Sequence, residues 1–123
     1  LADLFIDTFP YNAHTTCSDS LWSGLPVVTR IGNSFASRVG ASVLNAIGLE
    51  ELITKTNIEY EDLITQFATK PETLNKIKKK LEKNKNKEPL FNTKLFTSHI
   101  EKAYIKIYNN YQSDLSMKNI EIK

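Results

Sequence analysis

The stretch that decides the fold is Leu4-Phe-Ile-Asp-Thr-Phe-Pro-Tyr-Asn-Ala-His-Thr-Thr-Cys-Ser-Asp19. It opens with a short run that is apolar on both faces, which is typical of a parallel strand covered by helices. A proline ends the run, and a helix is expected to begin at Thr15 or Thr16, whose hydroxyls are candidate caps. Asp19 stands three residues after Thr16 in a box-like arrangement. The stretch therefore predicts a strand, a sharp turn and a helix that runs to about residue 23.

The residues that follow complete a βαβ unit. Gly24 and Pro26 end the first helix, and residues 27–29 form a second short strand, so the crossover should be right-handed. Ser34 is expected to cap the next helix. Apolar residues recur on one face of that helix, which we expect to point inward: Phe35, Val39, Val43 and Ile47. Residues 49–53 are compatible with either a helical turn or a short strand.

The C-terminal half is predicted to be rich in helix. Thr56 and Glu59 form a capping box, and Pro71 suits the first turn of another helix. Residues 83–88 lack apolar side chains and predict a solvated loop. The inward residues expected of the two helices are Leu63, Ile64, Phe67, Leu74, Ile77 and Leu81.

The longest predicted helix begins at Asn92 and Thr93 and is amphipathic. Residues 112–123 have little periodicity and are expected to be a frayed tail. The fold class is therefore α/β, with short parallel strands, a helix-rich C-terminal half and a long final helix. The apolar stripe of that helix comprises Phe96, Ile100, Tyr104, Ile107, Tyr108 and Tyr111.

Composition narrows the class of protein. The 123 residues suit one domain, and a net charge of +2 gives no strong attraction to nucleic acid or membrane. No apolar run approaches the roughly 18 residues of a membrane helix. The single cysteine, Cys17, excludes an internal disulfide and is compatible with a cytoplasmic location. The chain starts without Met and almost directly on a strand, so we expect a piece of a longer protein.

The predicted helix start has the chemistry of an anion site. Unpaired N–H groups and a partial positive charge gather at a helix N-terminus, and nucleotides bind at the carboxyl ends of parallel strands. The amides and hydroxyls of Thr15 and Thr16 can hold phosphate oxygens, His14 can donate to a phosphate or sugar, and Asp19 can accept from ribose hydroxyls. The alternative is that Thr16 and Asp19 only cap the helix and His14 is an exposed turn residue. On the residues alone, that alternative is favoured.

Other candidate sites have weaker support. Cys17 at a helix start suits a reactive thiol, but a buried thiol is favoured because no basic partner is visible. The basic run from Lys76 to Lys87 has no interleaved aromatic residue and is typical of a solvated helix face. His99 has no evident metal-ligand partner, so no metal site is expected. There is no G-x-G-x-x-G and no P-loop motif.

Three stretches carry a resemblance to a known family. The first is Asp7-Thr-Phe-Pro-Tyr-Asn-Ala-His-Thr-Thr-Cys-Ser-Asp-Ser-Leu-Trp-Ser-Gly-Leu-Pro26, and the others are Phe35-Ala-Ser-Arg-Val-Gly-Ala-Ser42 and Pro89-Leu-Phe-Asn-Thr-Lys-Leu-Phe-Thr97. Together they resemble the C-terminal end of the catalytic region of O-GlcNAc transferases and SPINDLY-like glycosyltransferases, family GT41. The resemblance extends to about Tyr111 and implies that residues 1–111 are the C-terminal part of the nucleotide-sugar-binding lobe of a GT-B fold, which has two Rossmann-like lobes.

The resemblance also implies a function and a site. His14, Thr15 and Thr16 would contact the donor diphosphate and Asp19 the ribose, with no catalytic residue, metal or cofactor in this chain. The implied reaction moves GlcNAc from UDP-GlcNAc to Ser or Thr of an acceptor protein. The implied partners are an upstream catalytic lobe and tetratricopeptide repeats of the same parent chain, so this chain alone is expected to be inactive. Arg38 lies in a matching stretch without an assigned role.

Two alternatives remain open at this point. One is a sister enzyme that uses another nucleotide sugar such as GDP-fucose, although the histidine at position 14 favours a UDP donor. The other is a non-catalytic domain that binds nucleotides or proteins.

Overall fold

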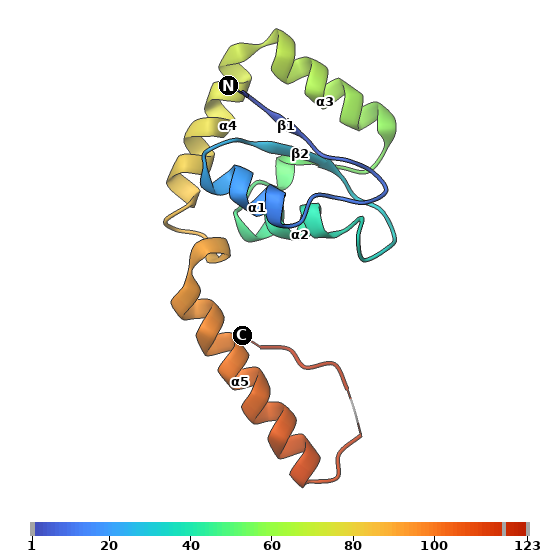
Figure 1. The fold of residues 1–123 in the computed structure, drawn as a ribbon, viewed down its shortest axis with the longest axis vertical. Helices are drawn as coiled ribbons and strands as arrows, with labels where there is room; N and C mark the ends of the chain where they lie inside the picture. Colours follow the sequence, from blue (N-terminus) through green and yellow to red (C-terminus); the bar gives the residue numbers. More distant parts are fainter. Residues whose placement is uncertain (1, 117, 123) are drawn as a thin grey trace. The chain divides into compact units, whose positions relative to one another are not determined.

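The computed structural model describes residues 2–116 and 118–122. The chain forms two compact units, Leu1–Leu90 and Phe91–Lys123. The first holds a small parallel sheet with its helices, and the second holds a long helix and the segment after it (Figure 1). The proposed domain limit at residue 111 stays a prediction.

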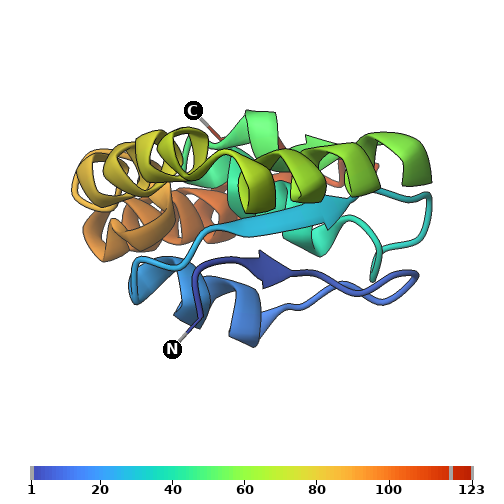
Figure 2. The same ribbon diagram turned by 90° about the horizontal axis from the view of Figure 1, so that it is seen from above.

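The sheet of the first unit has three parallel strands in the order β1–β2–β3. They are β1 (Phe5–Ile6), β2 (Val27–Arg30) and β3 (Ile53–Thr54). Phe5 pairs with Val27, and Thr29 pairs with Ile53. In Figure 2 the arrows of β1 and β2 point the same way. The predicted parallel strands are confirmed, and residues 49–53 contain both expected forms, the 3₁₀ turn η1 (Glu50–Leu52) and the start of β3.

Helices cover both faces of this sheet. The first connecting helix is α1 (Thr15–Trp22) and the second is α2 (Val39–Ala46), and both lie on one face, while α3 (Asn57–Thr69) lies on the other (Figure 1). Two right-handed crossovers that step across the sheet in the same direction place their helices on the same side. The core between these layers is apolar and fully buried; it includes Leu21, Val27, Val28, Leu44, Ile47 and Leu52.

The end of α1 and the start of α3 follow the sequence signals. Gly24 has a φ of +86°, and its N–H donates to the Leu21 carbonyl at 3.1 Å, so the glycine ends the helix as predicted. The capping box of α3 is confirmed: the Thr56 hydroxyl accepts from the Glu59 N–H at 3.1 Å, and the Glu59 carboxylate accepts from the Thr56 N–H at 3.4 Å.

The start and the inward face of α2 were predicted wrongly. The N-cap is Arg38, not Ser34. Ser34 and Ser37 instead hold a local turn, in which the Ser34 N–H donates to the Ser37 hydroxyl at 3.1 Å. Such side-chain hydrogen bonds compete with helix formation, so α2 begins only at Val39. Its buried residues are Gly40, Ala41 and Leu44.

The predicted stripe of α2 is instead turned outward, apart from the buried Ile47. Phe35 is 73% exposed, and Val39 and Val43 are half-buried. These three residues line a shallow cavity of about 350 Å³ together with Arg38 and Ser42. The cavity lies on the outward side of α2, and Arg38 is one of the residues that line it.

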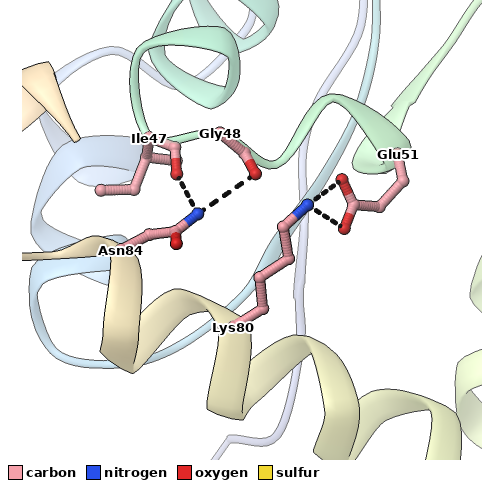
Figure 3. A network of polar contacts seen from close by, with 5 residues as sticks. All are labelled: Ile47, Gly48, Glu51, Lys80 and Asn84. Carbon is pink, nitrogen blue, oxygen red and sulfur yellow. Dashed lines mark hydrogen bonds and ion pairs between the residues drawn. The ribbon is translucent and has the colours of Figure 1, made fainter. Parts of the chain in front are cut away.

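The helix α4 (Pro71–Asn84) begins at Pro71 as predicted and buries Leu74 and Leu81. The expected loop from residue 83 is wrong at its start, because α4 continues to Asn84 and that residue is buried. The Asn84 amide donates to the carbonyls of Ile47 at 2.8 Å and Gly48 at 3.2 Å, as Figure 3 shows.

A second polar contact joins α4 to the first half of the unit. Lys80 Nζ lies 2.7 and 2.9 Å from the two carboxylate oxygens of Glu51 in η1 (Figure 3). Together with the Asn84 amide, this ion pair fastens α4 to the end of α2 and the segment after it.

The second unit is built on α5 (Thr93–Gln112), which follows the 3₁₀ turn η2 (Pro89–Phe91). Asn92 caps α5 by accepting from the Leu95 N–H at 3.0 Å, as predicted. In the part of the chain that the structure describes, no side chain of α5 is buried, and its predicted apolar stripe is exposed. The predicted frayed tail spans residues 112–123, of which 117 and 123 lie outside the described residues. No helix among the described residues is both long enough and apolar enough to cross a membrane.

Candidate functional site

The turn between β1 and α1 is held by a buried carboxylate. Asp7, directly after β1, is only 5% exposed. Its Oδ1 accepts from the N–H groups of Thr8 at 2.8 Å and Ala13 at 2.7 Å, and its Oδ2 accepts from the Thr29 hydroxyl at 2.5 Å. One side chain therefore closes the turn at both of its ends and ties it to the centre of β2.

A glycine of α2 leaves room for this arrangement. A Cβ at Gly40 would lie 2.7 Å from Asp7 Oδ2 and 2.7 Å from Thr29 Oγ1, too close for any larger residue. We call these three residues, Asp7, Thr29 and Gly40, the Asp7 cluster. This cluster was not predicted from the sequence. One available signal was the turn after Asp7, because a buried carboxylate needs several donors and a turn can supply them.

Asn12 fastens the same turn from within. It is fully buried, and its Nδ2 donates to the carbonyls of Thr8 at 2.9 Å and Arg30 at 3.4 Å. Its own N–H donates to the Ala36 carbonyl at 3.0 Å. The turn is thus joined to the carboxyl end of β2 and to the local turn that precedes α2.

His14 occupies the N-cap position of α1 between two aromatic rings. Its ring stacks on Tyr11 with centroids 4.9 Å apart, and Phe35 meets it edge-on at 6.2 Å. The His14 Nε2 atom is buried and has no hydrogen-bond partner among the described residues. A buried polar atom without a partner is uncommon, and these ring contacts show that His14 is not simply an exposed turn residue. The roles of Tyr11 and Phe35 were not anticipated from the sequence.

Thr15 and Thr16 are the first two residues of α1, and both are exposed. The predicted cap at one of these threonines is wrong, because the cap position falls on His14, whose side chain makes no capping hydrogen bond. The N–H groups of a first helical turn have no partner within the helix, and the helix dipole adds a partial positive charge there. These amides and the two threonine hydroxyls are therefore available to an anion.

Asp19 is exposed and follows one turn later on the same helix. Residues four apart lie on one side of a helix, so Asp19 shares a side with Thr15. The structure thus places His14, Thr15 and Thr16 at the N-terminal end of α1, beyond the carboxyl end of β1, and Asp19 one turn further along the helix. Ligands of open α/β sheets bind at this position.

The thiol of Cys17 is not part of this candidate anion site. It is fully buried, and burial, followed by the charge of Asp7, raises the pKa of Cys17 to about 12. The protonated thiol is therefore the stable form at neutral pH, which favours the buried, inert role over the reactive one. Among the described residues, no three His, Cys, Asp or Glu side chains gather closely enough to hold a metal ion.

Comparison with known proteins gives the same family throughout. Residues 1–100 match glycosyl transferase family 41. The chain is 37% identical over 111 residues to a "Probable UDP-N-acetylglucosamine--peptide N-acetylglucosaminyltransferase SPINDLY" of Hordeum vulgare, covering 90% of this chain and 12% of that protein. It is 34% identical over 120 residues to a "UDP-N-acetylglucosamine--peptide N-acetylglucosaminyltransferase" of Caenorhabditis elegans, covering 98% and 10%.

A solved structure agrees with these relatives. The Thermobaculum terrenum O-GlcNAc transferase, in a K341M mutant, superposes with a TM-score of 0.79 at 32% identity. The match covers 88% of this chain and 21% of that one, so the present chain corresponds to a limited part of such proteins. The expected α/β class and the resemblance to O-GlcNAc transferases and SPINDLY-like proteins are confirmed. The chain belongs to glycosyl transferase family 41.

Proposed function

We propose that this chain is the donor-binding part of a protein O-GlcNAc transferase, which moves GlcNAc from UDP-GlcNAc to Ser or Thr hydroxyls of a protein. The observation that carries the proposal is the start of α1, where an unpartnered His14 Nε2 stands beside two exposed threonines. The printed names of the Hordeum vulgare and Caenorhabditis elegans relatives support the donor and the peptide acceptor.

The geometry suits a nucleoside diphosphate in the following way. The amides and hydroxyls of Thr15 and Thr16 bind phosphate oxygens, His14 donates to a phosphate or a sugar hydroxyl, and Asp19 accepts from the ribose hydroxyls. As the sugar leaves, negative charge grows on the UDP phosphate, and fixed donors at a helix start stabilise that charge without reorganising. The helix start supplies this stabilisation without a metal ion. The sugar acceptor and the rest of the reaction require the parent protein, so we expect no transfer by the 123-residue chain alone.

A donor screen on the full-length protein tests the reaction. Transfer to a protein acceptor is measured with UDP-GlcNAc, UDP-glucose and GDP-fucose, and we expect transfer from UDP-GlcNAc only. Transfer from GDP-fucose alone would overturn the donor assignment and favour the sister enzyme. Nucleotide binding without any transfer would instead favour a non-catalytic binding domain.

A pair of aspartate variants tests the site. Asp19→Ala in the full-length protein should weaken UDP binding by about tenfold, the value of roughly one charge-assisted hydrogen bond. Asp62→Ala is the matched control, because Asp62 is also an exposed aspartate within a helix but lies in α3. Equal UDP affinities for the two variants, measured by calorimetry, would remove Asp19 from the ribose site.

A further inference from the structure

We infer that the Asp7 cluster is a positioning device that sets where His14 and the first amides of α1 meet the donor. This inference rests on the proposed function, since it concerns how that site is held. Asp7 itself is a positioning residue and no ligand group. Its buried negative charge would repel a diphosphate, and its two oxygens already accept from three donors of the chain.

The path from the sheet to the site is short. Thr29 lies in the central strand β2 and is fully buried, so the packing of the sheet fixes the position of its hydroxyl. That hydroxyl fixes Asp7 Oδ2, while Asp7 Oδ1 fixes the Ala13 N–H. Ala13 is joined directly to His14, the first residue of the proposed site. A shift of Asp7 is therefore passed to the site through one hydrogen bond and one peptide unit.

Contacts from both faces of the sheet converge on the same residue. From α2, the absent side chain of Gly40 admits the carboxylate. From α3, the Tyr60 hydroxyl donates to the Asp7 carbonyl, and burial together with the charge of Asp7 raises the pKa of that hydroxyl. A turn that only needed to connect β1 to α1 would not require support from three elements. Site residues hold their geometry only when their neighbours are themselves locked by packing and hydrogen bonds.

Two buried threonines on adjacent strands provide a matched test. Thr29→Val removes the hydroxyl that reaches Asp7 while keeping the shape of the side chain. Thr54→Val is its control, because Thr54 in β3 is 5% exposed and its hydroxyl donates to the backbone carbonyl of Thr29 at 3.0 Å, not to the Asp7 carboxylate. Thr29→Ser restores the hydroxyl and should rescue the variant.

Two measurements are made on the full-length protein. Without ligand, hydrogen exchange of residues 8–16 should become faster in Thr29→Val and stay unchanged in Thr54→Val and Thr29→Ser. With UDP, affinity should fall by about tenfold in Thr29→Val, because a displaced site loses roughly one hydrogen bond to the charged donor. Equal exchange and equal UDP affinity in Thr29→Val and Thr54→Val would overturn the inference.

The two measurements separate this inference from the proposed function. If wild-type protein binds no UDP, the proposed function fails and the donor role of the cluster fails with it. If UDP binds normally in every variant while exchange rises in Thr29→Val alone, the site stands and its control by the cluster is refuted. Should Thr29→Val not fold, Tyr60→Phe removes the half-buried hydroxyl on Asp7 from the other face, and about threefold weaker UDP binding is expected.

Discussion

The helices α1 and α3 begin in opposite ways. At α3 the Thr56 hydroxyl accepts from the Glu59 N–H and the Glu59 carboxylate accepts from the Thr56 N–H, so local side chains cap this helix start. At α1 the cap position is His14, which makes no capping hydrogen bond, and exposed threonines follow it. The stability that α3 draws from local side chains is replaced at α1 by the Asp7 cluster behind the turn. Because the Asp7 cluster fixes the turn before α1, no side chain needs to cap this helix, and its first amides stay free for a ligand. At α3, the capping side chain already occupies one of these amides.

The largest expected effect concerns Cys17, which lies in the first turn of α1. A helix start lowers the pKa of an exposed thiol, but burial and the Asp7 charge raise that of Cys17 from 9.0 to about 12. The folded protein at about pH 8 should therefore hold about a thousandfold less thiolate at this position than the unfolded protein. Alkylation by iodoacetamide, followed by peptide mass spectrometry, should be slower in the folded protein by at least this factor, because burial also keeps the reagent from the sulfur. Equal labelling rates in the folded and unfolded protein would contradict both the burial of this thiol and its raised pKa.

The next largest effect is expected when the Asp7 cluster, which supports the start of α1, is removed. Asp7→Ala removes the acceptor of the Thr8 and Ala13 N–H groups and leaves the buried Thr29 hydroxyl without its partner, which should lower the free energy of unfolding by about 3 kcal/mol. Urea unfolding followed by tryptophan fluorescence gives this value. A loss below that of a simple helix-cap variant would mean that the start of α1 does not depend on the Asp7 cluster.

A smaller effect separates binding from stability at α1. Thr16→Ala should weaken UDP binding by about tenfold, because a hydroxyl that contacts a charged phosphate is lost. Since Thr16 is exposed and is not the cap, its replacement should change the free energy of unfolding by less than about 0.5 kcal/mol. Calorimetry with UDP and urea unfolding of the same sample provide both numbers. A loss of stability with normal UDP binding would restore the capping interpretation.

The smallest expected effect is the counterpart at α3. Thr56→Ala should destabilise the protein by about 1 kcal/mol, the usual value of an N-cap, and leave UDP affinity unchanged. The variant removes the hydroxyl that accepts from Glu59 and touches no residue of the proposed site. Weaker UDP binding in Thr56→Ala would show that the two helix starts are not independent.

The positions of the four candidate site residues along the fold could be predicted, but the contacts that hold the turn before them could not. His14, Thr15, Thr16 and Asp19 are close in sequence, so their placement along the first turns of one helix follows from a strand, a turn and a helix. The partners of Asp7 are distant, since Thr29 lies 22 positions further along the chain. Nothing in the local pattern states which buried hydroxyl a carboxylate will meet. For the same reason the Tyr11 and Phe35 rings around His14 were missed.

The sequence by itself determined where several helices start and stop, because these features depend on interactions between near neighbours in the chain. The stop at Gly24, the capping box at Thr56 and the start at Pro71 depend on backbone angles and hydrogen bonds between near neighbours, which residue types specify directly. The same holds for the family, because its motifs are continuous stretches.

Only the tertiary structure decided which faces are buried. The helix α2 carries two plausible inward faces, and packing selected the small one because Gly40 must lie against Asp7 and Thr29. Asn84 appeared to belong to a solvated loop until the carbonyls of Ile47 and Gly48, more than 30 positions away, gave its amide a buried partner. Contacts between distant segments depend on how the whole chain packs, so no short stretch of sequence contains them.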